Sequence, residues 1–451
     1  MKLWEKGIKT KDIILEFTAG KDRVLDLQLA KEDVIASMAH AEMLGAVNLL
    51  SKAETNDLIC TLLDIYKSIE KGDFEIETGM EDIHSQVEKI LTEKLGDTGK
   101  KVHTARSRND QVITDLKLYY RSEIISIVEK LQMLVEKLLS KSDENANVEI
   151  PGYTHFQAAM PSSFGLWFGA YAESLTEDLQ LLSGTFRYIN QNPLGSAAGY
   201  GSSFPIDRQI TTDLLEFEDL HINSVNAQLS RGKSEKLMMS GISGIAGSLS
   251  KMAMDMVLFL NQNFNLMSLK DEFTTGSSIM PHKKNPDVLE LVRAKANRIQ
   301  SKEAEVLAVI NNLPSGYHRD FQLLKEICFP AINDMNQLLQ IMTLVIDNVE
   351  MKSIDRIEDK YKYLGTVDAI NEKVIKGVPF RDAYKEVADE IRDGKYESGQ
   401  KFEHSHIGSI GNTGNDRIRE KLKKEIAYFQ PEKYSSFNSR FIQKMKKKCN
   451  V

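Results

Sequence analysis

The sequence predicts an all-α protein in which a central bundle of long helices is flanked by two smaller helical domains. Three observations support this fold class. Prolines leave long gaps, since residues 1–150 contain none and none lies between Pro205 and Pro281. Proline breaks helix interiors, so these gaps allow long helices. Apolar residues recur at steps of three and four, and the period-two alternation of strands is scarce.

Each long helix is predicted by its own apolar face. The first follows residue 108 and has the face Val112, Leu116, Tyr119, Ile124, Ile127, Leu131, Leu134 and Leu138. The second has the face Met238, Ile242, Ile245, Leu249, Met252, Met256 and Leu260. The third follows Pro286 and has the face Val292, Ala296, Ile299, Val306 and Ile310. This spacing is typical of helix bundles.

Helices of this length predict an assembly of several chains. They exceed what a compact monomer normally covers, so their apolar faces are expected to meet partner subunits in a closed homo-oligomer. The small-residue run 240–247 indicates a close approach between helices, because glycine is costly inside a helix. A coiled-coil scaffold is the alternative. Polar loops with proline and glycine between the helices argue against it, because such loops often carry function.

The chain is expected to divide into three parts. An N-terminal helical domain covers residues 1–107, the central long-helix bundle covers 108–356, and a small helical C-terminal domain covers 357–451. A chain of 451 residues is too long for one ordinary core, which agrees with several domains.

Composition excludes several classes of protein. The net charge of −7 argues against a nucleic-acid binder. The three cysteines form no CxxC pair, so neither a zinc ribbon nor a disulfide framework is expected. The first residues lack the apolar core of a signal peptide, and no apolar run approaches the ~18 residues that span a bilayer. A soluble protein in the reducing cytoplasm, without a membrane partner, is therefore expected.

Two polar loops flank the first long helix. Residues 103–111 contain Arg106 and Arg108 just before that helix. Their Ser, Asn and Asp side chains can cap the helix, but arginines beside free helix N–H groups also make an anion site. Residues 151–157 contain His155, which is either a structural hydrogen-bonding group or a proton donor near neutral pH.

Two further loops precede and follow the third helix. Residues 274–286 are rich in hydroxyl, amine and amide groups, and are either a flexible linker or an active-site lid. Residues 317–325 contain Tyr317, Gln322 and Lys325, which suit a polar ligand or a plain helix surface. The sequence has no nucleotide-binding motif, and His404 and His406 are a weak pair of metal ligands without a third nearby.

The loop at 274–286 closely resembles the GSSxMPxKxN signature of the fumarase/aspartase superfamily, with Gly276, Ser277, Ser278, Met280, Pro281, Lys283 and Asn285. The two earlier loops are similar to the SRNDQ and GYTH segments of argininosuccinate lyases. Similar segments recur in order from Leu3-Trp4 to about residue 384, including 193–196, 204–208 and 377–381. Adenylosuccinate lyase, fumarase and aspartase share mainly the 274–286 signature.

The resemblance implies a fumarase/aspartase-like fold and a homotetramer in which three loops from three different subunits surround each site. It implies argininosuccinate as the small-molecule substrate, no cofactor and no metal. The implied reaction is the reversible β-elimination to arginine and fumarate in arginine biosynthesis. Another superfamily lyase, such as one resembling adenylosuccinate lyase, is an alternative. A crystallin-like structural relative without activity is a second alternative.

The matched motifs assign roles to residues. The resemblance makes Ser277 the base, Lys283 the cation that lowers the serine's pKa and stabilises the intermediate, and His155 the acid. Whether Ser277 or His155 takes the proton is left open. Substrate binding is carried over to His84, Ser107, Arg108, Asn109, Thr154, Asn285, Tyr317, Gln322 and Lys325.

Four departures from the family pattern bear on substrate binding. Gly20 stands where many argininosuccinate lyases have a substrate-contacting serine, so a backbone N–H or Lys21 is expected to replace the hydroxyl, or substrate affinity differs. Ala105 replaces a usual glycine, and His282 replaces a usual glutamine. Residues 223–233 carry basic residues in place of a usual acidic stretch, which is expected to alter the electrostatics of the site or of a subunit interface.

Overall fold

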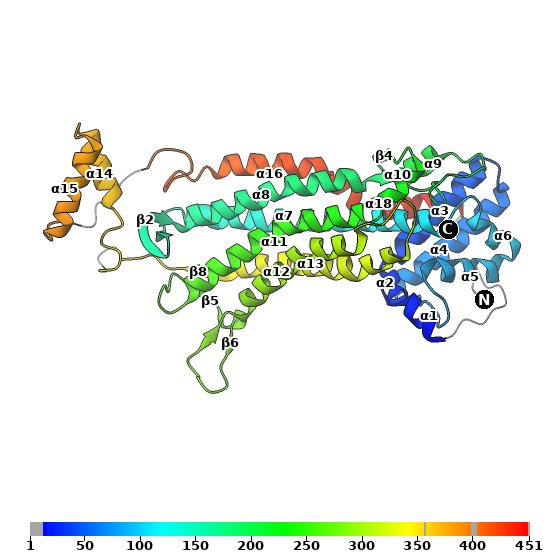
Figure 1. Cartoon of the computed structure of the whole chain (residues 1–451), viewed down its shortest axis with the longest axis horizontal. Coiled ribbons are helices and arrows are strands. Elements are labelled where there is room, and N and C mark those ends of the chain that lie inside the picture. Colours follow the sequence, from blue (N-terminus) through cyan, green and yellow to red (C-terminus); the bar gives the residue numbers. More distant parts are fainter. Residues whose placement is uncertain (1–11, 356–357, 398–403, 450–451) are drawn as a thin grey trace.

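The computed structural model describes residues 12–355, 358–397 and 404–449, and the predicted all-α fold is confirmed. The start of the family resemblance at Leu3-Trp4 lies outside the described residues. Five long helices run side by side along the longest axis of the molecule (Figure 1). They are α7 (Arg108–Glu144), α8 (Phe164–Ile189), α11 (Lys233–Leu260), α12 (Asp287–Ile310) and α13 (Leu323–Asn348).

The predicted apolar faces form the core of this bundle. Leu131, Leu134 and Leu138 of α7 are fully buried, as are Leu249 and Met252 of α11. Helix α11 packs against α8 and α12, while α13 packs against α7 and α12. Each helix therefore buries the stripe that its three- and four-residue spacing marks.

The small-residue run on α11 brings two helices close together, as predicted. A Cβ atom at Gly241 would lie 3.0 Å from Leu182 Cδ1 and 3.1 Å from Thr185 Oγ1, both on α8. At Gly244 it would lie 3.0 Å from Asp178 Oδ1. Larger residues at these positions would force α8 and α11 apart.

Helix α11 is also apolar and long enough to cross a membrane, judged by length and composition alone, and it is the one such helix in the described part of the chain. The core helix of a soluble protein passes the same test. Met238, Ile242, Ile245 and Leu249 are fully buried in the bundle. The packing of α11 in this structure is therefore that of a core helix.

A second core lies at one end of the bundle. It is built mainly from α3 (Ala30–Ala46), α4 (Lys52–Lys71) and α5 (Ile83–Leu95), with α6 (Asp97–Lys100) and a 3₁₀ turn at Lys101–His103 beside them. The preceding helices α1 (Asp12–Ala19) and α2 (Asp22–Leu25) lead into a 3₁₀ turn at Asp26–Leu29, where Leu29 belongs to the core of the bundle instead. Val34, Met38, Leu58 and Leu62 are fully buried between α3 and α4. The short helices α9 (Arg208–Leu214) and α10 (Ser224–Leu229) complete this end.

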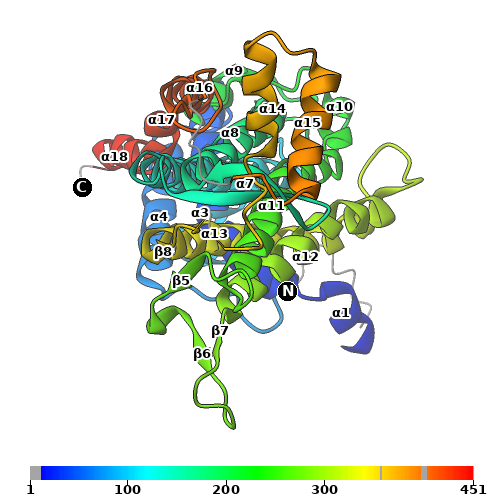
Figure 2. The ribbon, with the colours of Figure 1, turned by 90° about the vertical axis from the view of Figure 1, so that its left-hand side faces the viewer.

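The helices after residue 357 go to different places. Helices α14 (Thr366–Ile375) and α15 (Phe380–Arg392) pair at the far end of the molecule, where Figures 1 and 2 show them projecting beyond the bundle. Helices α16 (Asn415–Phe429) and α17 (Pro431–Ser435) return along α7, with α16 also packing on α8. Helix α18 (Phe437–Lys448) joins α3 and α4. The division at residues 107 and 356 stays a prediction, and residues 357–451 contribute to more than one packed region.

Short strands form hairpins that the sequence did not predict. Strands β1 (Glu149–Thr154) and β2 (Gln157–Ser163) pair antiparallel around the 151–157 loop, and β6 (Thr275–Gly276) pairs with β7 (Lys284–Asn285) around the signature loop. Figure 1 shows the β6–β7 hairpin projecting from the side of the bundle. The other strands are β3 (Gln191–Asn192) with β4 (Asp219–Leu220), and β5 (Met267–Leu269) with β8 (Val349–Met351).

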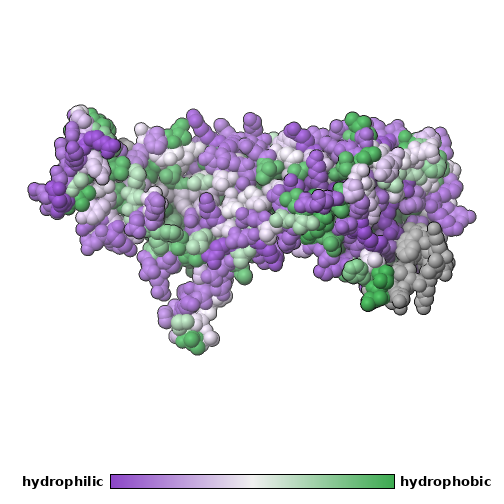
Figure 3. Space-filling view, in the orientation of Figure 1, coloured by the Kyte–Doolittle hydropathy of each residue, from purple (hydrophilic) through white to green (hydrophobic). Residues whose placement is uncertain are grey.

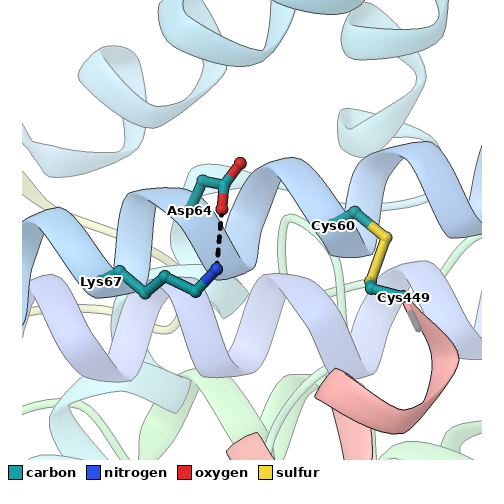
Figure 4. Close-up of a disulfide and its surroundings, with 4 residues drawn as sticks. All are labelled: Cys60, Asp64, Lys67 and Cys449. Atoms are coloured by element: carbon teal, nitrogen blue, oxygen red, sulfur yellow. Dashed lines mark hydrogen bonds and ion pairs between the residues drawn. A yellow bond between two sulfur atoms is a disulfide. The ribbon is translucent and has the colours of Figure 1, made fainter. Parts of the chain in front are cut away.

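The sequence predicted no disulfide framework, but two of the three cysteines are paired. Cys60 on α4 and Cys449 after α18 form a disulfide, with their Cα atoms 5.7 Å apart (Figure 4). They are separated by 389 residues in the sequence, so spacing alone could not pair them. The packing of α18 on α4 brings them together, while Cys328 is a free, buried thiol.

Candidate active site

Six of the predicted substrate-binding residues line one cavity of about 300 Å³. The cavity lies where the start of α7, the start of α13 and the N-terminal helices meet. The six residues are His84, Arg108, Asn109, Tyr317, Gln322 and Lys325. Three loops that are far apart in the sequence thus form one polar site within a single chain.

The start of α7 both caps the helix and faces the cavity. Ser107 Oγ accepts a hydrogen bond from the Asn109 N–H at 3.2 Å, and Asp110 Oδ1 accepts one from the Ser107 N–H at 2.9 Å. Asp110 Oδ2 also accepts bonds from the N–H groups of Gly195 and Ala197, both at 2.9 Å. The predicted capping function is confirmed for Ser107, and Asp110 ties the 193–197 loop to α7.

The arginine at the start of α7 is already ion-paired. Arg108 Nη1 lies 3.1 Å from Asp82 Oδ2 and 3.4 Å from Glu81 Oε2, and Nη2 donates to Ser85 Oγ at 3.1 Å. Burial works to raise the pKa of Asp82, but the charges of His84 and Arg108 outweigh it and lower that pKa. The carboxylates hold the guanidinium at the cavity wall, so an anionic ligand has to share it with them.

His84 is buried beside two carboxylates. Its Nδ1 lies 2.6 Å from Asp33 Oδ2 and 3.7 Å from Asp115 Oδ2, and Gln111 Nε2 donates to the same Asp33 oxygen at 2.6 Å. Within the described residues His84 Nε2 has no hydrogen-bond partner. Burial and the neighbouring Asp33 raise the pKa of Asp115 well above its usual range. This arrangement fixes the ring by Nδ1 and leaves Nε2 for another group.

The side chains of Asp33, His84 and Asp115 have the spacing of metal ligands, since their nitrogen and oxygen atoms lie within 4.8 Å of one another. The 2.6 Å contact between His84 Nδ1 and Asp33 Oδ2 is the length of a charge-assisted hydrogen bond, which accounts for their closeness. Of the weak pair of possible metal ligands, His404 and His406, His404 likewise contacts a carboxylate, since its Nε2 lies 2.9 Å from Asp368 Oδ1.

The start of α13 is joined to the segment between α1 and α2. Lys325 Nζ lies 2.7 Å from Asp22 Oδ1 and 2.5 Å from Asp26 Oδ1. Gln322 Nε2 donates to the carbonyls of Thr18 at 3.1 Å and Ala19 at 2.7 Å. Two of the predicted substrate-binding side chains, Gln322 and Lys325, are therefore held by other groups of the chain.

The predicted acid lies elsewhere, at the exposed turn between β1 and β2. His155 and Phe156 occupy the left-handed region, with φ of 54° and 58°, and both side chains are exposed together with Thr154. His155 borders a separate cavity of about 420 Å³ that Trp167, Phe259 and Phe264 line with aromatic rings.

The predicted base lies at a third place, on the β6–β7 loop. Ser277 Oγ accepts hydrogen bonds from the N–H groups of Met280 at 3.2 Å and Ile279 at 3.4 Å. Asn285 Nδ2 donates to the Gly276 carbonyl at 3.5 Å, and Lys283 is exposed. Figure 3 shows an apolar spot at the tip of this projecting hairpin, where the Ile279 side chain is 83% exposed.

One chain cannot bring these three places together. Asn109 lies at the start of α7, and His155 lies beyond its other end. With 37 residues, α7 spans about 55 Å. Figure 1 shows the β6–β7 hairpin apart from both ends of α7. The structure therefore groups six of the predicted substrate-binding residues at the cavity. It leaves Thr154 beside the predicted acid on the β1–β2 hairpin and Asn285 on the β6–β7 hairpin with the predicted base.

Several charged residues of the cavity are missing from the sequence-based prediction: Asp22, Asp26, Glu81, Asp82, Arg231 and Arg319. Glu81 and Asp82 directly precede His84, which was a usable signal. Arg231 belongs to the basic 223–233 stretch, and it pairs with Glu235 at 2.9 Å while donating to the Phe321 carbonyl at 2.9 Å. That this stretch alters the electrostatics of the site or of a subunit interface stays a prediction, and Arg231 is a residue of the stretch that lines the cavity.

Comparison with known proteins decides the family. Residues 9–301 match a family model described as "Lyase". The chain is 50% identical to the argininosuccinate lyase of Parabacteroides distasonis over 441 residues, which cover 98% of this chain and 99% of that protein. This chain belongs to the argininosuccinate lyase family. It is also 50% identical to the argininosuccinate lyase of Phocaeicola vulgatus over 428 residues, covering 95% and 96% of the two chains.

Two solved structures share the fold of this chain. An EDDS lyase in complex with formate superposes with a TM-score of 0.75 at 18% identity, covering 98% of this chain and 96% of that one. A class II fumarase from Schistosoma mansoni gives 0.69 at 15% identity, covering 84% and 89%. At these identities the likeness concerns the fold, and the family assignment rests on the sequence relatives.

Proposed function

We propose that this protein is an argininosuccinate lyase, which splits argininosuccinate into arginine and fumarate by a reversible β-elimination. The observation that carries the proposal is the 50% identity to an argininosuccinate lyase over 98% of the chain. The residues that the chemistry needs are also present, namely a hydroxyl at Ser277, an amine at Lys283 and an imidazole at His155.

We assign the base to Ser277. Elimination requires removal of a weakly acidic proton from the carbon beside a substrate carboxylate. A serine can do this only as an alkoxide, which needs stabilisation by nearby donors or positive charge. The Ile279 and Met280 N–H groups donate to Ser277 Oγ, and Lys283 adds positive charge to the same loop. Loss of the proton leaves a carbanion whose charge spreads onto the carboxylate, where fixed cations stabilise it.

We assign the acid to His155. When the C–N bond breaks, its electron pair stays on the guanidino nitrogen, which takes a proton and leaves as part of arginine. The remaining carbons form the double bond of fumarate. An imidazolium can give this proton near neutral pH. In the reverse direction the same two groups exchange their functions as acid and base.

The 300 Å³ cavity is the proposed site for the rest of the substrate. Argininosuccinate carries three carboxylates, one ammonium and one guanidinium group, so a complementary site needs both signs of charge. Cationic side chains of Arg108, Arg231, Arg319 and Lys325 line the cavity together with the carboxylates of Asp22, Asp26, Glu81 and Asp82. Such alternation selects an amphoteric ligand over a simple dicarboxylate.

We propose that the active site is completed in a homotetramer, with the three loops contributed by three subunits. The length of α7 supports this, because it keeps Asn109 and His155 of one chain far apart. Exposed apolar groups support it as well. Ile279 and Phe156, at the tips of the two hairpins, are 83% and 73% exposed, and only 44% of the apolar window of α11 is buried within one chain. In a single chain these hairpins lie in water, whose high dielectric weakens the stabilisation of charge that the reaction needs. Partner subunits that cover them would exclude this water.

A place in arginine biosynthesis in the cytoplasm is part of the same proposal. It is supported by the family to which the chain belongs. In that compartment the Cys60–Cys449 bond would depend on the local redox state, because thiols are kept reduced there.

The test is ultraviolet detection of fumarate from purified protein given argininosuccinate, adenylosuccinate, aspartate and malate in separate reactions. We expect fumarate from argininosuccinate alone. Release from adenylosuccinate alone would identify a different lyase of the superfamily. Release from none of the four would support the crystallin-like alternative. Either of these two results would overturn the proposal.

A further inference from the structure

The segment between α1 and α2 meets the cavity without the hydroxyl that many family members carry there. Gly20 has φ +53°, and a Cβ atom at this position would lie 3.3 Å from Gln322 Nε2. Gln322 already holds the segment through the Thr18 and Ala19 carbonyls. A serine side chain therefore fits poorly at residue 20, so any polar side chain that this segment presents to the cavity has to come from another residue.

Lys21 is not that residue. Its Nζ pairs with Glu326 Oε2 at 2.8 Å, and its side chain is 72% exposed. The cavity is lined instead by the next residue, Asp22, whose side chain is 17% exposed. Asp22 and Lys21 thus both contact α13, but only Asp22 faces the site. Figure 1 shows α2, which begins at Asp22, beside the start of α13.

The charges around Asp22 leave an excess of negative charge at this corner. Lys325 Nζ is shared between Asp22 at 2.7 Å and Asp26 at 2.5 Å, so two carboxylates face one ammonium. The neighbouring Arg231 also acts to lower the pKa of Asp22, but its guanidinium is paired with Glu235. Burial raises the pKa of Asp22 to about 6, which is still below 7, so most of the carboxylate is charged at neutral pH. A cationic ligand group would complete the charge balance.

An α-amino acid end has the required complementary pattern. Its carboxylate and ammonium groups sit on one carbon, and Lys325 and Asp22 present the opposite charges side by side. The carboxylate would bind Lys325 while the ammonium binds Asp22, giving four alternating charges. A plain dicarboxylate offers no cation for Asp22 and would meet repulsion there.

We propose that Asp22 is a substrate-specificity residue that binds the α-ammonium group of the arginine end of the substrate. This inference rests on the proposed lyase activity. Asp26 keeps its ion pair with Lys325 when the ligand binds Asp22.

The test compares two probes as inhibitors of fumarate release from argininosuccinate. L-Arginine carries the α-ammonium group, and 5-guanidinopentanoate is the same molecule without it. The variant Asp22→Asn keeps the shape of the side chain and removes its charge. Lys21→Ala is the matched control, because it lies in the same segment and contacts the same helix but does not face the cavity.

In the unsubstituted protein, arginine should bind about tenfold or more tightly than 5-guanidinopentanoate, as a charge-assisted hydrogen bond predicts. Asp22→Asn should weaken the binding of arginine by that factor and change the affinity for 5-guanidinopentanoate by no more than about twofold. It should also raise KM for argininosuccinate more than it lowers kcat. Lys21→Ala should still bind arginine more tightly than 5-guanidinopentanoate.

Two results would overturn the inference. Equal weakening of both probes by Asp22→Asn would mean that Asp22 only positions Lys325. Loss of the preference in Lys21→Ala with none in Asp22→Asn would assign the contact to Lys21. Both results require a protein that releases fumarate from argininosuccinate. A protein that releases none would contradict the proposed lyase activity instead.

Discussion

Ser277 provides the most direct test at the scale of one residue. Replacing it with alanine removes the hydroxyl that we assign as the base but none of the groups that line the 300 Å³ cavity. Ser277→Ala should lower kcat by roughly three orders of magnitude or more, while argininosuccinate still binds in calorimetry. Ser278→Ala, on the neighbouring exposed hydroxyl, should stay near normal. Near-normal turnover in Ser277→Ala would remove this serine from the mechanism.

Glu32 gives a prediction about pH and stability. Burial raises its pKa from 4.5 to about 7 on folding. The folded chain therefore holds this proton more tightly than the unfolded chain, and the free energy of unfolding falls as pH rises from 4.5 to 7. Glu32→Gln removes that loss, so it should be more stable than the unsubstituted protein above pH 7 by about 1–3 kcal/mol.

The measurement is urea unfolding at pH 4.5 and pH 8 at one protein concentration. Below pH 4.5 the two proteins should converge, because the glutamate is then protonated in both states. The exposed Glu420→Gln is the control and should show no such pH-dependent gain. An equal difference at both pH values would contradict this explanation of the Glu32 pKa.

Sequence patterns located individual residues well where a motif or a cap marked them. The capping residues of α7 and six cavity residues were found in this way. Asp33 and Asp115 were not, because they lie inside long helices where an acidic residue ordinarily faces water. Only the packing of α3 on α7 shows that these carboxylates are buried around His84.

At the scale of elements, the long helices were predictable and the hairpins were not. Three- and four-residue spacing marks α7, α11 and α12 directly. The β1–β2 hairpin contains Pro151 and Gly152, and its short strands lack a clear period-two alternation. Its chain reversal depends on positive φ at His155 and Phe156, which those residue types do not reveal in advance.

Ala105 shows how a departure from the family pattern is absorbed locally. Its φ of 58° lies in the left-handed region, which glycine adopts readily and alanine only with strain. The residue is buried just before the N-terminus of α7. The surrounding contacts, including the Asp110 cap, must therefore hold the turn in place.

The C-terminal helix α18 gives a prediction at this scale. It buries Phe437, Phe441 and Met445 against the N-terminal helices, and the Cys60–Cys449 disulfide closes its end (Figure 4). Cys449→Ser should lower the free energy of unfolding by about 2–4 kcal/mol under oxidising conditions, because the cross-link restricts the unfolded chain.

The measurement is urea unfolding of Cys449→Ser and the unsubstituted protein, with and without dithiothreitol. In the reducing buffer the two proteins should unfold alike, which serves as the internal control. Equal stability in the oxidising buffer, with a disulfide verified by mass spectrometry, would show that the bond does not stabilise this end of the fold.

At the scale of the whole molecule, the sequence predicted a bundle too long for one compact monomer, and the structure gives that prediction a geometric basis. The predicted acid, the predicted base and the substrate cavity lie at three separate places in one chain. No local pattern reveals such separation, because it depends on the direction in which each helix runs. A site of this kind predicts that inactive chains can complement one another.

The central claim is that argininosuccinate is split at a site shared between chains. The most direct measurement is fumarate release after subunit exchange between two inactive variants, Ser277→Ala and His155→Ala. Their substitutions lie on different hairpins, so some mixed sites receive an intact loop from each chain. We expect activity that neither variant has alone. Ser277→Ala mixed with Lys283→Ala should stay inactive, because both substitutions damage the same loop. No recovered activity from the first pair, with mixed oligomers verified by mass spectrometry, would contradict the shared site.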